Sequence, residues 1–105
     1  TLADRTDRFE EALGYIEAAF ALDPDNPAII DSLGWVLFRL GRAEEALVHL
    51  ERAFEAYQDA EVAAHLGEVL WALGRQDEAR EIWEQGRRID PDSRHIRDTV
   101  ERLLP

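Results

Sequence analysis

The chain has 105 residues, of which 12 are basic and 23 acidic, giving a formal net charge of −11. Every basic residue is Arg, and there is no Cys, which excludes a disulfide framework, a thiolate metal site and a Cys nucleophile. The length suits one domain with its own core. The acidity argues against nucleic acid as a partner, and no apolar run is long enough to span a membrane.

The N-terminal part of the chain predicts a helical stub at residues 1–5, about one turn, followed by a helix within residues 7–25. The Asp-Pro-Asp-Asn-Pro segment then ends this helix and starts the next one, because Pro does not continue a helix interior. We expect Asn26 to cap the following helix and Pro27 to occupy its first position.

Two helices are predicted in the middle of the chain, within residues 27–40 and 41–59. The first has apolar residues at three- and four-residue steps, and Gly41 follows it where a left-handed residue closes a helix. The second has a single apolar stripe. These apolar positions are Ile30, Leu33, Leu37 and Leu40, and then Ala46, Leu47, Leu50, Ala53 and Phe54.

The same arrangement returns in the last third of the chain, with helices predicted within residues 60–73, 74–92 and 94–104. Gly74 repeats the role of Gly41, and Ser93 is expected to cap the last helix, as Thr6 is expected to cap the first. In the last helix the apolar residues are Ile96, Val100 and Leu104. We expect them in the repeat positions of Ile29, Leu33 and Leu37.

An internal repeat underlies this organisation. Residues 7–25, 41–59 and 74–92 align with one another without gaps, and the helices between them form a second aligned family. Residues 30–37 (Ile-x2-Leu-Gly-x2-Leu) and 63–70 (Ala-x2-Leu-Gly-x2-Leu) resemble the tetratricopeptide repeat, a helix–turn–helix unit with the pattern W-x2-L-G-x2-Y. The resemblance covers essentially the whole chain.

The resemblance implies an all-α fold, a right-handed α-solenoid of antiparallel helix pairs with six main helices plus the N-terminal stub. It divides the chain into the end of a truncated repeat (1–26), two complete repeats (27–59 and 60–93) and a capping helix (94–105). Since a partner helix is expected before residue 7, the chain is interpreted as a fragment of a longer protein. The chain also looks similar to the C-terminal repeats of Gram-negative bacterial proteins, some of which are periplasmic lipoproteins. Its location, in the cytoplasm or in the periplasm, stays open.

The same resemblance implies a non-enzymatic module that binds a peptide or protein segment in a concave groove lined by the first helix of each repeat. The alternative is an architectural or self-association segment, with a homodimer left open. Exposed Trp residues beside Arg are typical of binding hot spots. The candidate partner-binding residues are Asp31, Trp35, Phe38, Arg39, Glu68, Trp71 and Arg102.

Trp35 is expected to be exposed, whereas Phe38 and Trp71 are equally consistent with packing against adjacent repeats. Chaperone-binding members of the family hold a peptide C-terminus with Lys, Asn and Arg side chains on these helices. This chain has no Lys, so such a clamp is not expected here.

No pattern in the sequence predicts catalysis, a cofactor or a metal site, and we expect neither nucleic-acid binding nor membrane insertion. The three His residues lack metal-ligand spacing, so packing or surface roles are favoured for His49, His65 and His95. Gly34 and Gly67 are costly inside helices, which predicts close helix packing against Ala46 and Ala79. Glu84 is expected to pair with Arg88.

Overall fold

The computed structural model describes residues 2–104, and for residues 2–7 it describes the backbone only. Six helices are present in this part of the chain, as predicted. They are α1 (Leu2–Leu22), α2 (Pro27–Arg39), α3 (Ala43–Ala56), α4 (Ala60–Ala72), α5 (Gln76–Ile89) and α6 (Arg94–Leu103).

The N-terminal prediction of a separate stub is wrong. Helix α1 runs without a break from Leu2 to Leu22, so Thr6 lies inside a helix and does not cap one. The physical reason is that no Pro or Gly separates residues 2–5 from the segment that follows. Without a breaker, one turn of helix simply continues into the next.

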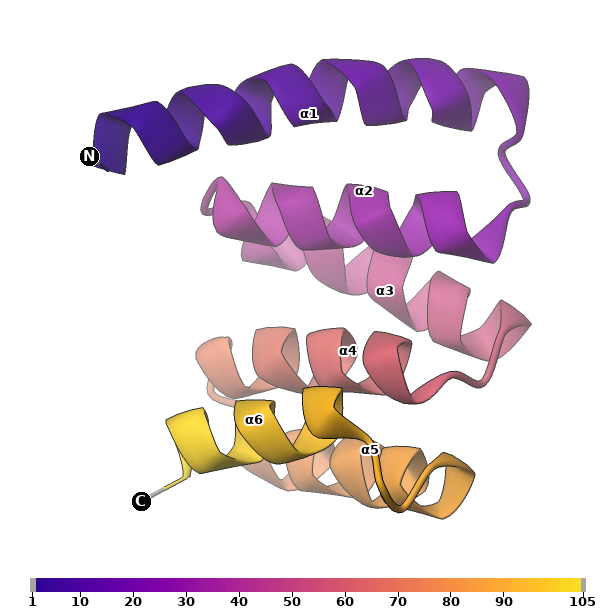
Figure 1. The fold of residues 1–105 in the computed structure, drawn as a ribbon, viewed down its shortest axis with the longest axis vertical. Helices are drawn as coiled ribbons and strands as arrows, with labels where there is room; N and C mark the ends of the chain where they lie inside the picture. Colours follow the sequence, from indigo (N-terminus) through magenta and orange to yellow (C-terminus); the bar gives the residue numbers. More distant parts are fainter. Residues whose placement is uncertain (1, 105) are drawn as a thin grey trace.

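The helices form two layers, with α2, α4 and α6 in one and α3 and α5 behind them (Figure 1). Helix α2 packs against α3, and α4 against α5, so the fold is a stack of helix pairs. Helix α1 lies at one end of the stack on α2, and the chain ends at the opposite end (Figure 1). The architecture is an all-helical solenoid of helix pairs.

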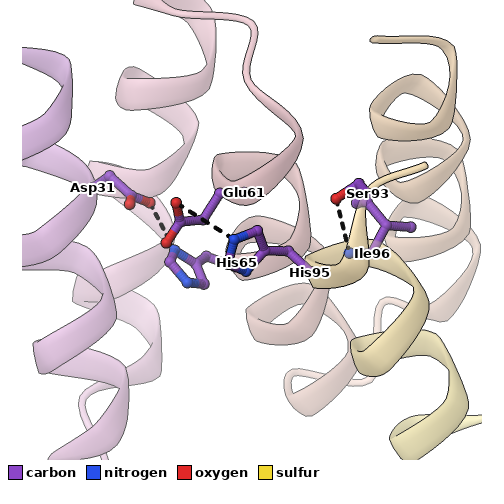
Figure 2. A network of polar contacts seen from close by, with 6 residues as sticks. All are labelled: Asp31, Glu61, His65, Ser93, His95 and Ile96. Atoms are coloured by element: carbon purple, nitrogen blue, oxygen red, sulfur yellow. Dashed lines mark hydrogen bonds and ion pairs between the residues drawn. The ribbon is translucent and has the colours of Figure 1, made fainter. Parts of the chain in front are cut away.

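The predicted helix ends are confirmed at four places. The Asn26 side chain accepts a hydrogen bond from the backbone N–H of Ala28 at 3.0 Å, with Pro27 in the first helical position. The Ser93 hydroxyl accepts one from the N–H of Ile96 at 3.3 Å (Figure 2). Gly41 and Gly74 have φ angles of 85° and 81°, in the left-handed region that favours Gly at the end of a helix.

The register of α6 differs from the prediction by one residue. Ile96 is 1% exposed, as is Ile30, and Thr99 is also buried. Ile96 therefore occupies the slot of Ile30, and Thr99 that of Leu33. The sequence pattern missed this because Thr counts as polar, although its methyl group can be buried in a core position.

Gly34 and Gly67 mark close contacts between the layers. A Cβ atom at Gly34 would lie 2.7 Å from Leu50 Cγ and 3.2 Å from the carbonyl oxygen of Ala46, so the predicted approach to Ala46 is confirmed, with Leu50 added. At Gly67 the three atoms nearest to such a Cβ all belong to the indole of Trp83. The bulk of Trp83, which stands where α3 has Leu50, explains this difference.

Candidate binding face on the first helices of the repeats

The side-by-side packing of α2, α4 and α6 creates one surface that carries most of the predicted site, called the first-helix face below. Its first polar contact joins α2 to α4. Asp31 Oδ1 lies 2.9 Å from Nδ1 of His65, and the two side chains are only 13% and 16% exposed (Figure 2). A buried carboxylate needs such a partner, so this pair fixes the two helices against each other.

Trp35 lies against the same His. The two rings are stacked, with centroids 4.2 Å apart and an interplanar angle of 20°. Phe38, one turn further along α2, lies 5.5 Å from Trp35 between ring centroids. Trp35 is therefore half-buried, less exposed than expected, because the His65 side chain covers one of its faces. The structure brings Trp35 and Phe38 together as expected.

The next polar contact joins α4 to α6. The guanidinium of Arg102 donates two hydrogen bonds to the carboxylate of Glu68, one of them 3.1 Å long. The Glu68 side chain is 8% exposed and that of Arg102 is 55% exposed. These hydrogen bonds, followed by the charge of Glu68, raise the pKa of Arg102 although partial burial opposes them. The predicted site residues Glu68 and Arg102 thus neutralise each other.

A third pair has the same form. His95 Nε2 of α6 lies 3.8 Å from a carboxylate oxygen of Glu61 in α4 (Figure 2). In all three pairs the acid precedes its basic partner by 34 residues, on the next first helix. Sequence reasoning missed His65 and this ladder. An acid and a base one repeat apart on consecutive first helices were the available signal.

Trp71 and Arg39 lie apart from this centre. The ring of Trp71 faces buried Trp83 of α5 at 5.8 Å, and the guanidinium of Arg80 lies 5.8 Å from its centroid. Trp71 is half-buried at the α4–α5 contact, which is the packing alternative left open by the sequence. Arg39 is exposed and lies over the ring of Phe9 in α1, 5.3 Å from its centroid.

Two further observations limit the chemistry of the described residues. Among residues 8–104, whose side chains the structure describes, no three side chains are arranged to hold a metal ion. Within the same residues, no helix has the length and apolar character needed to cross a membrane.

Glu84 pairs with Arg87 at 2.7 Å and not with Arg88 as predicted, so this ion pair spans three residues and not four.

Stacked helix pairs with glycine at their closest contacts define a repeat protein of the helical solenoid class. The Tetratricopeptide repeat family profile matches residues 6–64 and 37–103. The chain therefore belongs to the tetratricopeptide repeat family, as its sequence pattern predicts. The crystal structure of TTC0263, a tetratricopeptide repeat protein from Thermus thermophilus, superposes with a TM-score of 0.80 at 24% identity. It covers 91% of this chain and 50% of that one, and shows the shared fold.

Three relatives have similar sequences. TPR repeat-containing protein PA4667 of Pseudomonas aeruginosa is 53% identical over 68 residues, which is 65% of this chain. Protein STIP1 homolog of Dictyostelium discoideum is 30% identical over 89% of the chain, and the Hsp70-Hsp90 organizing protein of Triticum aestivum is 31% identical over 86%. The chain covers only 12%, 17% and 16% of the lengths of these relatives, respectively.

Proposed function

We propose that the chain is a non-enzymatic interaction module whose first-helix face binds a peptide or protein segment, as an adaptor or scaffold does. The carrying observation is Trp35, a half-buried indole held between His65 and Phe38. Extended surfaces of this kind are what helical repeat proteins use to bind partners.

The arrangement around Trp35 favours binding for a thermodynamic reason. An indole already fixed by its neighbours loses little rotamer freedom when a partner covers it, and Trp is enriched among binding hot spots. We assign the apolar contact to Trp35 and Phe38, with Trp71 at the edge of the face and exposed Arg39 as a charged neighbour. Asp31, Glu68 and Arg102 act by positioning the helices.

The pairing of charges on this face bears on which partner fits. Because Asp31 and Glu68 are already bound to His65 and Arg102, the face offers few free charges for long-range attraction. Selection among partners then depends mainly on apolar fit. The exposed charges around the face supply the rest of the selectivity. We therefore favour a segment with an apolar or aromatic anchor over a strongly charged one.

The name of one relative, the Hsp70-Hsp90 organizing protein, supports a protein partner. We do not extend the proposal to a clamp for a terminal carboxylate. The corresponding face here carries Asp31, Trp35, Ala64 and Glu68, and the chain has no Lys. These residues do not supply the cations that such a clamp needs.

The test is a comparison of two aromatic truncations against a partner first identified by affinity capture and then purified. Trp35→Ala should weaken binding by about tenfold or more, while helical circular dichroism stays unchanged. Tyr15→Ala, which removes a 79% exposed ring from α1, is the matched control and should leave the affinity unchanged. Equal affinities for the parent and Trp35→Ala would reject the proposal. Trp71→Ala is unsuitable because Trp71 packs on Trp83.

A further inference from the structure

A cleft lies between α3 and α5, the two helices of the second layer (Figure 1). Helix α4 packs against both of them, but among the described residues no Cα atom of α3 lies within 8 Å of one in α5. The space between the two helices has a volume of about 340 Å³. None of the residues assigned above to the first-helix face lines this space, so the cleft is a separate site.

The floor of the cleft is apolar. Phe54 of α3 and Leu66 of α4 are buried, and Ile82 of α5 is half-buried and packs against them as part of the core. Because the floor comes from three helices of the packed core, it is formed before any partner binds. An aliphatic group that covers it gains free energy by removing apolar surface from water.

The rim of the cleft carries negative charge and hydrogen-bond acceptors. Glu51 and Glu55 line it from α3, one helical turn apart, and both are exposed. Within residues 8–104, neither carboxylate has an ion-pair partner. Gln58 donates through its amide nitrogen to the carbonyl oxygen of Phe54, which leaves its amide oxygen as a further acceptor. The rim therefore favours a cationic donor.

The neighbouring bases do not neutralise this rim. Arg52 stands between the two Glu residues in the sequence, but its guanidinium donates to Asp25 at 3.0 Å. Arg75 at the start of α5 is bound to Glu78 at 2.6 Å. The hydrogen bond to Glu78 is the main cause of the raised pKa of Arg75, and the charge of Glu51 contributes least. Since like charges one helical turn apart repel each other, a cation that binds both carboxylates is favoured.

We propose that this cleft binds a basic peptide segment of a partner protein, in which an arginine stands next to an aliphatic residue. The aliphatic residue and the stem of the arginine cover the floor at Ile82, as long basic side chains do on apolar surface. The guanidinium donates to the carboxylates of Glu51 and Glu55, which its planar fork matches. The net charge of −11 attracts such a segment and repels an acidic one. A segment bound here leaves the first-helix face free for another partner.

The probe is a short labelled peptide of alternating arginine and leucine residues, added to the 105-residue chain. Its matched control is the same peptide with citrulline, which has nearly the same shape and no charge, in place of every arginine. We expect saturable binding of the arginine peptide and binding at least about tenfold weaker for the citrulline peptide. Since this change is in the peptide, it leaves the folding of the chain unaffected.

Substitutions in the chain locate the site. Glu51→Gln combined with Glu55→Gln should weaken binding of the arginine peptide by about tenfold. Glu10→Gln combined with Glu11→Gln removes the same charge from α1 and should leave the affinity unchanged. All four side chains are exposed, so circular dichroism should not change. Trp35→Ala should also leave this affinity unchanged, which separates the cleft from the first-helix face.

Several results would overturn the proposal. They are the absence of saturable binding, equal binding of the two peptides, equal effects of the two double substitutions, and loss of binding in Trp35→Ala. A molecular mass that rises with concentration in the chain alone, and falls when Glu51 and Glu55 are replaced by Gln, would also overturn it, because a second copy of the chain would then be the occupant.

Discussion

Gly67 of α4 lies directly against the indole of Trp83 in α5, so that a Cβ atom at residue 67 would fall 2.6 Å from Trp83 Cδ1. Trp83 is 1% exposed, and its Nε1 has no hydrogen-bond partner among the described residues. The contact therefore depends on shape and not on a polar bond. It holds the second complete helix pair together, and the face that carries Glu68 is built on that pair.

We expect Gly67→Ala to lower the free energy of unfolding by about 1–3 kcal/mol, because the added methyl group must displace a rigid ring in a filled core. This loss outweighs the gain in helix propensity of about 1 kcal/mol. Urea unfolding followed by circular dichroism measures it. Gly14→Ala is the matched control, since no atom beyond its chain neighbours and its own helix backbone lies within 4 Å of its Cβ position; it should be neutral or stabilising. A free energy of unfolding for Gly67→Ala equal to that of the parent would contradict the packing described.

Removal of Arg102 should leave the buried carboxylate of Glu68 without its partner. We expect Arg102→Ala to cost about 1–2 kcal/mol of unfolding free energy, reduced from the value for fully buried pairs because Arg102 is half exposed. The loss should also loosen α6, which hydrogen exchange can follow. Arg97→Ala, an exposed residue on the same helix, removes the same charge and should change little. Equal effects of the two substitutions would show that the pair contributes nothing specific.

His49 should make the fold less stable in mild acid. Burial, and then the nearby charge of Arg52, lower the pKa of His49, while Glu45 opposes this. The unfolded chain therefore takes up a proton first, near the ordinary value of about 6.5. The stabilising contribution is complete above this pH and is lost as the pH falls through it towards the lowered pKa.

The measurement is the free energy of unfolding between about pH 8 and pH 5, the range in which His titrates. His49→Gln should flatten the decline on the acid side. Val48→Gln changes an exposed neighbour that does not titrate, and should keep the slope of the parent. An unchanged slope in His49→Gln would assign the acid sensitivity to other groups.

The fold could be predicted because local and repeat signals agree. Asn26, Gly41 and Gly74 mark helix ends by their own chemistry, and the apolar spacing marks the buried stripes. The failures have physical causes too. Thr6 was expected to be a cap because of its residue type, but no Pro or Gly interrupts the chain around it, so the helix continues through it. Thr99 was overlooked because a core position can accept a polar residue type.

The site was predicted less well, because its geometry depends on contacts between repeats. Periodicity places Trp35 off the core stripe, but it does not show that His65, on the next first helix, stacks on it. The sequence indicates surface charges at Asp31 and Glu68. The residues around each of them do not show that it meets a base 34 residues later. Trp71 could have faced either side of α4, and only the position of Trp83 decides between them.

The most direct test of the binding face is site-specific photo-crosslinking with p-benzoylphenylalanine, placed in turn at two exposed positions. Ser32 lies on α2 beside Asp31, and Val48 lies on α3, with a side chain that is 65% exposed. A purified partner should crosslink from position 32 and not from position 48, and Trp35→Ala should abolish the crosslink. Crosslinking from position 48, or equal yields from both positions, would contradict binding by the first-helix face.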